Sequence, residues 1–124
     1  SDPASGAMWI AIQEINNNSQ LLPNYTLDLQ VFDTQADVQN ILRQAVKIIN
    51  HKSTDDHLYF PIMLGPPWSM LSVAIAPVLN SFRFGLMSHY ASSTTLSDTH
   101  DYPYFYRTVG HAMVGAEGFI ALCI

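Results

Sequence analysis

Two short stretches of this sequence combine residue types that could hold a polar ligand. The first, residues 65–72, reads Gly-Pro-Pro-Trp-Ser-Met-Leu-Ser and follows an apolar run that ends at Leu64. Its Gly-Pro pair predicts a sharp turn, and Ser69 is expected to be the N-cap of the helix that follows. Free backbone N–H groups at the start of a helix favour an anion such as a carboxylate or a phosphate. Capping of its own helix is the more usual role of such a serine, and this alternative stays open.

The second stretch, residues 88–98, is rich in hydroxyl groups. It reads Ser-His-Tyr-Ala-Ser-Ser-Thr-Thr-Leu-Ser-Asp, with five Ser and Thr residues between Ser92 and Ser97. Each hydroxyl can both donate and accept a hydrogen bond, which suits a polar ligand such as an amino acid. The alternative is an ordinary surface loop, which composition alone favours. A ligand role therefore depends on the two stretches lying together in the fold.

The sequence carries no arrangement that is typical of catalysis. The five histidines have no zinc-type spacing with the single cysteine and form no helical His-x-x-x-His pair. Neither a Gly-x-Ser-x-Gly elbow nor a phosphate loop ending in Gly-Lys-Ser/Thr is present. Asp55-Asp56-His57 could bind a metal, although a solvated loop is the simpler interpretation, and Cys123 lies in an apolar stretch, where a thiol is usually inert. The sequence therefore predicts no enzyme, no cofactor and no metal.

Composition narrows the class of protein further. The chain has 124 residues, of which 48% are hydrophobic and 12% are charged, enough apolar material for one core. Its net charge of -5 and its 5 scattered Lys and Arg residues argue against nucleic acid as a partner. No apolar run reaches the roughly 18 residues of a membrane span. Because residues 118–124 are an apolar run at the end of the sequence, we expect both ends to be cut edges of a larger protein.

Hydrophobic periodicity predicts alternating helices and strands. The expected helices cover residues 7–15, 36–49, 70–82 and a last segment from residue 112, and the expected strands cover residues 25–31, 58–64, 84–88 and 104–109. Asp33 or Thr34 is the expected cap of the second helix. Pro77 predicts a kink or an early end in the third helix.

This alternation of elements predicts one α/β unit with a mostly parallel sheet and helices on both faces. In open parallel sheets, ligands bind beside the loops that follow the carboxyl ends of the strands. Residues 65–72 and residues 88–98 each follow a predicted strand. We therefore expect the two polar stretches to lie at the same edge of the sheet.

Nearly the whole chain carries an ordered set of short motifs. They are Ala11–Asn16, Leu21–Asn24, Leu27, Asp33-Thr34, Gly65-Pro66, Ser69, Ala74–Pro77, Ser88, Ser92-Ser93, Leu96–Asp98, Tyr102-Pro103 and Phe105–Thr108. In order and spacing the set resembles the receptor family ligand-binding region, which includes natriuretic-peptide receptors and class C G-protein-coupled receptors. It is most similar to the class C members, among them vomeronasal and taste-type receptors.

The resemblance implies the type I periplasmic-binding-protein fold, a Venus-flytrap clamshell of two α/β lobes that close on a ligand. Residues 1–124 would be a partial ligand-binding domain that matches only the first part of lobe 1, with lobe 2 absent. The implied ligand-binding residues are Trp68, Ser69, Tyr90, Ala91 and Ser92. In amino-acid-binding members, the serine matching Ser69 and the small polar residues matching Ala91 and Ser92 hold the α-carboxylate and amino group, and Tyr90 falls on a lining position.

The resemblance also implies where the protein works and with what. It implies the extracellular ligand-binding region of a cell-surface signalling receptor, tethered to the plasma membrane through downstream segments and dimeric through lobe 1. The expected ligand is an amino acid or a similar small molecule. Two glycosylation sequons, Asn17-Asn18-Ser19 and Asn24-Tyr25-Thr26, are compatible with this location. The alternatives are a receptor guanylyl cyclase ectodomain, a bacterial periplasmic solute-binding protein of the same fold and, third, an α/β enzyme fragment.

Several residues depart from the family pattern. Trp68 stands where many members have Cys or Ser, and Gln35 stands where many class C receptors have Cys, so the usual lobe-1 disulfide is absent. Met70 and Leu71 make the first stretch more apolar than in glutamate receptors, and Val109–Ala112 replaces the usual Pro-Ser-Asp. These departures argue against glutamate as the ligand.

Overall fold

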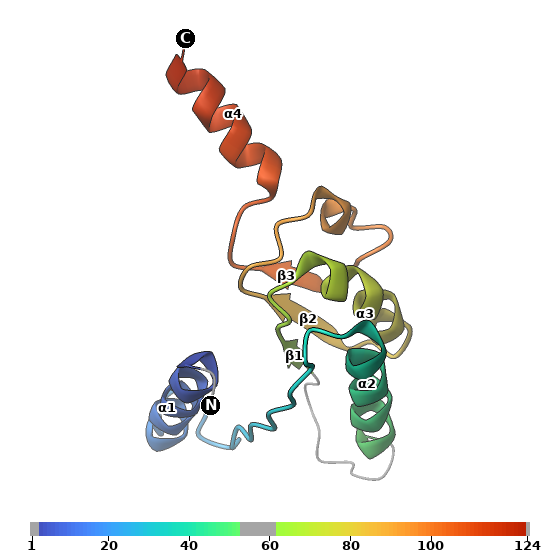
Figure 1. Cartoon of the computed structure of the whole chain (residues 1–124). Coiled ribbons are helices and arrows are strands. Elements are labelled where there is room, and N and C mark those ends of the chain that lie inside the picture. Colours follow the sequence, from blue (N-terminus) through green and yellow to red (C-terminus); the bar gives the residue numbers. More distant parts are fainter. Residues whose placement is uncertain (1–2, 53–61, 124) are drawn as a thin grey trace. The chain divides into compact units, whose positions relative to one another are not determined.

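The computed structural model describes residues 3–52 and 62–123 (Figure 1). The elements in chain order are α1 (Pro3–Asn17), α2 (Val38–Lys52), β1 (Ile62–Leu64), α3 (Ser69–Ser81), β2 (Gly85–Ser88), the 3-10 helix η1 (Thr94–Ser97), β3 (Phe105–Arg107) and α4 (Ala112–Cys123). They divide into two compact units, residues 1–33 and residues 34–124. The sequence predicts a single unit, and membership of both in one lobe of a larger domain stays a prediction. No described helix has the length and apolar character needed to cross a membrane.

The first unit consists of α1 and the chain that follows it. The predicted strand at residues 25–31 is wrong, because this segment does not belong to a strand. A strand forms only where a neighbouring backbone can pair with it. Here the side chain of Asn16 takes that place: its Nδ2 donates to the carbonyl of Leu27 at 2.9 Å, and its Oδ1 accepts from the Leu27 N–H at 2.9 Å. Alternating polarity alone therefore misidentified the segment.

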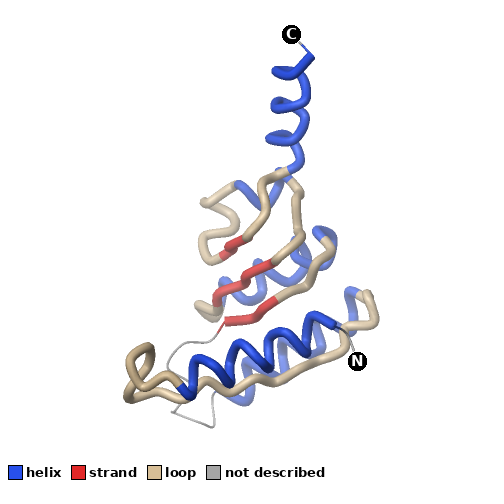
Figure 2. Tube along the Cα trace, turned by 90° about the vertical axis from the view of Figure 1, so that its left-hand side faces the viewer, coloured by secondary structure: helices blue, strands red, loops and turns tan. Residues whose placement is uncertain are grey.

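The second unit contains a three-stranded parallel sheet in the order β1-β2-β3 (Figure 2). Met63, Leu86 and Phe105 are aligned across the three strands. The predicted parallel α/β arrangement is therefore confirmed. The strands predicted at residues 84–88 and 104–109 are present, and the strand predicted at 58–64 is present at its end, while residues 58–61 lie outside the described residues.

The core of this unit lies between the sheet and the helices α2 and α3. Its buried residues are Ile41 and Ala45 from α2, Leu71, Ile75, Ala76 and Leu79 from α3, and Phe84 and Leu86 around β2. Met63 and Phe105, which flank Leu86 in the sheet, pack against this cluster. The strand residues next to these, Ile62, Leu64 and Tyr106, point to the opposite face of the sheet and are exposed. Within this unit, the described helical layer of α2 and α3 thus covers the face of Leu86.

The start of α2 differs from the expected one. Asp37 is its N-cap, because its Oδ2 accepts from the N–H of Asn40 at 2.7 Å, so neither Asp33 nor Thr34 caps the helix. Gln35 and Ala36 adopt left-handed backbone angles, with φ of 52° and 53°. This turn, closed by a bond from the Asp37 N–H to the Thr34 carbonyl at 3.0 Å, delays the helix by two residues from the predicted start.

Helix α3 continues past Pro77 to Ser81, so the predicted early end is wrong. Proline removes one backbone donor from a helix interior and usually weakens it. In α3, Ile75, Ala76 and Leu79 are buried on both sides of the proline, whereas Pro77 itself is exposed. The burial of these apolar side chains outweighs the lost hydrogen bond and keeps the segment helical.

The end of α3 carries a residue that suits its backbone poorly. Arg83 has a φ of 58°, and its N–H donates to the Asn80 carbonyl while the Phe84 N–H donates to the Leu79 carbonyl. This pair of bonds is the Schellman motif, in which glycine is favoured at the position of Arg83. We expect Arg83→Gly to raise the free energy of unfolding by about 0.5–1 kcal/mol, measured by urea denaturation. Arg83→Ala should leave it nearly unchanged, and an equal gain in both variants would assign the effect to the lost charge instead.

Candidate functional site

The two polar stretches lie at the same edge of the sheet, as the sequence predicts. Leu64 ends β1 and is aligned with Met87 of the parallel neighbour β2, so both strands deliver their following loops to one side. The first residue of the loop after β1 is held against β2, since the Gly65 N–H donates to the Met87 carbonyl at 2.8 Å. Gly65 has a φ of 91°, a conformation that favours glycine. The loops that follow β1 and β2 are called the first loop (residues 65–72) and the second loop (residues 88–98).

A buried group of hydroxyls joins the two loops at their base. Ser72 and Ser88 are both fully buried, and both donate to the carbonyl of Pro66, at 3.3 Å and 2.7 Å. The Ser88 hydroxyl also accepts from the N–H of Ala91 at 3.0 Å and from that of Tyr90 at 3.4 Å. Ser88 thus satisfies backbone groups of both loops in a region without solvent. Sequence reasoning missed this role, because nothing in the local pattern distinguishes Ser88 from the other hydroxyls of the second loop.

Ser69 of the first loop makes a second link between the two loops. It was expected to cap α3, but the N-cap position belongs to Trp68, and Ser69 is the first helical residue. The Ser69 hydroxyl instead accepts from the N–H of Ser93 at 3.1 Å. A side chain inside the first turn is set too far along to reach the N–H groups that an N-cap satisfies, which leaves its hydroxyl available to the second loop.

The second loop is also held by hydrogen bonds from the side chain of Arg107 in β3. Its Nη1 donates to the carbonyls of Ser93 at 2.9 Å and Ala91 at 3.4 Å, and its Nη2 bonds to the Ser97 hydroxyl. The Ser92 carbonyl accepts from the N–H of Ala112, the first residue of α4, at 2.9 Å. Sequence reasoning missed this role of Arg107, which it counted among the scattered basic residues and as part of the family motif Phe105–Thr108. Its contacts are 10 to 16 residues away in sequence, so no local pattern marks them.

The five predicted ligand-binding residues differ in how accessible they are. The side chains of Trp68 and Tyr90 are 59% and 68% exposed, and Ser69 and Ser92 are partly buried. Ala91 is fully buried, and both its N–H and its carbonyl are engaged inside the protein. A direct ligand contact of Ala91 stays a prediction, whereas its support of the loop is observed.

Hydrogen-bond donors remain available where the first loop meets the second, at residues 69–70 and 92–93, which are called the seam. No described residue forms a hydrogen bond with the N–H or the hydroxyl of Ser92. The N–H groups of Ser69 and Met70, in the first turn of α3, likewise lack a partner among the described residues. Together these groups offer donors, backed by the positive end of the helix dipole, that suit a carboxylate.

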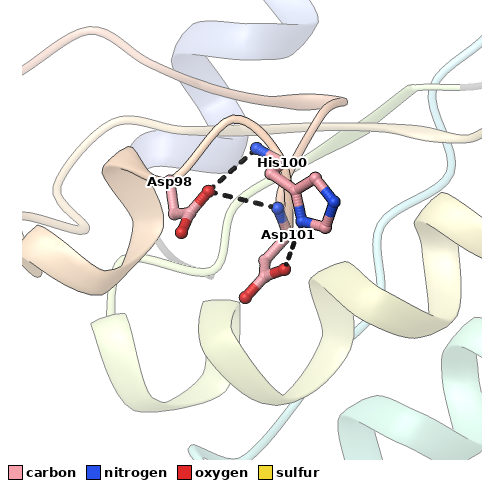
Figure 3. Close-up of side chains that lie close together, drawn as sticks. All are labelled: Asp98, His100 and Asp101. Atoms are coloured by element: carbon pink, nitrogen blue, oxygen red, sulfur yellow. Dashed lines mark hydrogen bonds and ion pairs between the residues drawn. The ribbon is translucent and has the colours of Figure 1, made fainter.

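A group that could hold a metal ion lies in the loop before β3 (Figure 3). Atoms of Asp98, His100 and Asp101 lie within 4.8 Å of one another, and all three residues are exposed. Asp98 accepts from the N–H of His100 at 2.9 Å and from that of Asp101 at 3.3 Å, and His100 Nδ1 lies 2.9 Å from Asp101 Oδ1. The hydrogen bond with Asp101 raises the pKa of His100, helped by the charges of Asp101 and Asp98. These contacts account for the turn itself, and the Asp55-Asp56-His57 candidate lies outside the described residues.

Comparison with known proteins identifies the family. The family described as receptor family ligand binding region matches residues 3–122 of this chain. The chain belongs to this family of receptor ligand-binding regions. Human taste receptor type 1 member 1 is 32% identical over 126 residues, which cover 94% of this chain and 15% of that receptor. The human extracellular calcium-sensing receptor is 31% identical over 115 residues, 83% of this chain and 11% of that receptor.

A third relative extends the set of receptors. Rat gamma-aminobutyric acid type B receptor subunit 2 is 34% identical over 103 residues, which cover 83% of this chain and 10% of that subunit. The predicted resemblance to class C receptors is therefore confirmed, as are the family fold and a receptor region rather than an enzyme. The chain spans only 10% to 15% of the length of these relatives.

Proposed function

We propose that this chain forms part of the first lobe of an extracellular ligand-binding region in a class C type receptor, and that it binds an amino acid or a similar small polar ligand. The seam between the first and second loops is the proposed site. The observation that carries the proposal is the Ser69–Ser93 hydrogen bond, which brings two loops from neighbouring strands together. Ligands of parallel α/β sheets bind at this edge.

The chemistry of the seam supports a ligand with a carboxylate. The donors are the N–H and hydroxyl of Ser92 and the N–H groups of Ser69 and Met70, none of which bonds to a described residue. The second loop holds no acidic side chain before Asp98. Hydrogen bonds to a charged group are about twice as strong as those between neutral groups. Trp68 and Tyr90 stand exposed beside these donors in the sequence and offer apolar surface for the rest of the ligand.

The proposal includes how binding becomes a signal. A ligand held by the first lobe and contacted by a second lobe would favour the closed arrangement of the two, since a ligand shifts a conformational equilibrium by its difference in affinity for the two states. We also propose location on the extracellular side of the plasma membrane and dimerisation through the first lobe. The taste, calcium-sensing and GABA type B relatives favour a class C receptor over a guanylyl cyclase or a solute-binding protein.

Removal of the Ser92 hydroxyl tests the site. In the whole ectodomain that contains this chain, we expect at least one of the twenty L-amino acids to raise the melting temperature. Ser92→Ala should weaken the binding of that amino acid about 10- to 100-fold, because a hydrogen bond to a charged group contributes about 1.5–3 kcal/mol. Ser69→Ala should weaken it as well, since the Ser93 N–H loses its acceptor and the seam loosens.

The control for these variants is Ser81→Ala. The Ser81 hydroxyl donates to the Pro77 carbonyl within α3, away from the seam, and its removal should leave ligand binding unchanged. Equal affinities in the parent, Ser69→Ala and Ser92→Ala proteins would place the ligand elsewhere. If none of the amino acids stabilises the parent protein, an amino-acid ligand is excluded.

A further inference from the structure

Arg107 contacts the second loop in a way that goes beyond general packing. Its guanidinium bonds to the carbonyls of Ala91 and Ser93, the two neighbours of Ser92, and to the hydroxyl of Ser97 at the end of η1. We infer that Arg107 is the positioning residue of the ligand site: it fixes the backbone on both sides of Ser92 and places a positive charge behind it. This inference rests on the proposed function.

The geometry of the guanidinium explains why arginine is needed. One nitrogen, Nη1, reaches both carbonyls while Nη2 reaches Ser97, so a single rigid group spans the loop from Ala91 to Ser97. Arginine presents its donors in a planar fork, whereas lysine has one flexible ammonium group. Bonds between a charged donor and a carbonyl are also stronger than those between neutral groups. The loop shape therefore depends on the fork and not only on the charge.

The same contacts determine which backbone groups face a ligand. Arg107 engages the carbonyls of residues 91 and 93, and the Ala112 N–H engages that of Ser92, so three successive carbonyls are occupied by protein donors. Free carbonyl oxygens would repel a carboxylate. With them occupied, the N–H and hydroxyl of Ser92, which bond to no described residue, are left to bind one. Because its carbonyls are occupied, this part of the second loop presents hydrogen-bond donors, and no free carbonyl oxygens, to a ligand.

The charge of Arg107 adds to this effect. Among the described residues, no carboxylate forms an ion pair with Arg107. Arg107 is partly buried, so its charge is screened less than that of an exposed arginine. A positive charge without a carboxylate partner behind Ser92 favours an anionic group at the seam. The guanidinium therefore acts through the loop, without a direct ligand contact.

The substitution Arg107→Lys separates this role from simple stability, because it keeps the charge and removes the fork. In the whole ectodomain that contains this chain, we expect amide hydrogen exchange of residues 89–97 to become faster, while exchange in α2 and α3 stays unchanged. The affinity for whichever of the twenty L-amino acids binds the parent should fall about tenfold, which corresponds to a loop ordered about one tenth of the time. Arg107→Gln, which also removes the charge, should lose more affinity than Arg107→Lys.

The matched control is Arg43→Lys, the same substitution at an exposed residue of α2, which should change neither measurement. Unchanged exchange in residues 89–97 of Arg107→Lys would overturn the inference, as would faster exchange with full affinity. Faster exchange throughout α2 and α3 would also overturn it, because Arg107 would then be a general structural residue. If no amino acid binds the parent, the proposed function fails and the ligand role of Arg107 fails with it. The exchange data still decide separately whether Arg107 holds the loop.

Discussion

Replacement of Phe84 by alanine is expected to lower the free energy of unfolding by about 3–5 kcal/mol. Phe84 lies between α3 and β2 and is only 2% exposed, and it is the largest fully buried side chain among the described residues. It belongs to the core cluster with Leu79 and Leu86. Truncation to alanine removes buried apolar surface and leaves a cavity that the surrounding helices fill only in part, so both terms destabilise the fold.

The position of Phe84 strengthens this expectation. Its N–H donates to the Leu79 carbonyl at the end of α3, and its side chain packs in the same cluster as the Leu79 side chain. An apolar contact of this kind accompanies the Schellman motif and fixes the direction in which the chain leaves the helix. Loss of the ring therefore weakens both the core and the helix end that leads into β2.

Phe82 provides the matched control for this experiment. It is the C-cap of α3, two residues earlier, and is 52% exposed. Phe82→Ala should change the free energy of unfolding by less than about 0.5 kcal/mol, as is usual for surface positions. Urea denaturation followed by circular dichroism measures both variants. Similar losses for the two phenylalanines would mean that the cluster around Phe84 is not the core of the unit.

The elements of the second unit were predictable because their patterns are local. Leu71, Ile75 and Leu79 recur every four residues and are all buried, which is the face of a helix that packs on a sheet. The first of the short apolar strands that flank α3 is followed by the turn residues Gly65 and Pro66. Alternation of these strands and helices then favours parallel pairing, and pairing brings the two loops to one edge.

The predictions that failed depend on partners that a local pattern does not reveal. Residues 25–31 alternate as a strand does, but whether a strand forms depends on a neighbour, and the side chain of Asn16 is what the structure provides. The ligand loop is a similar case. Its hydroxyl composition predicts polarity, whereas its shape comes from Arg107, 14 residues from its partner Ser93. The sequence thus located the candidate site without the residues that hold it in shape.

The second large effect is expected from Ser88→Ala, which should lower the free energy of unfolding by about 2–3 kcal/mol. The Ser88 hydroxyl donates to the Pro66 carbonyl at 2.7 Å and accepts from the N–H of Ala91 at 3.0 Å, all in fully buried surroundings. Alanine leaves the buried N–H of Ala91 without an acceptor. An unsatisfied buried polar group costs about 1–3 kcal/mol, in addition to the lost bond to Pro66.

Ser72→Ala separates this effect from the loss of any buried hydroxyl. Ser72 is equally buried and donates to the same Pro66 carbonyl, but its bond is longer, at 3.3 Å. Its removal leaves that carbonyl with the stronger bond from Ser88, so we expect a loss of only about 0.5–1 kcal/mol. Ser88→Ala should also speed the amide exchange of Tyr90 and Ala91, whereas Ser72→Ala should not. Equal losses and equal exchange in the two variants would show that Ser88 does not join the two loops, and the seam would then depend on the Ser69–Ser93 bond alone.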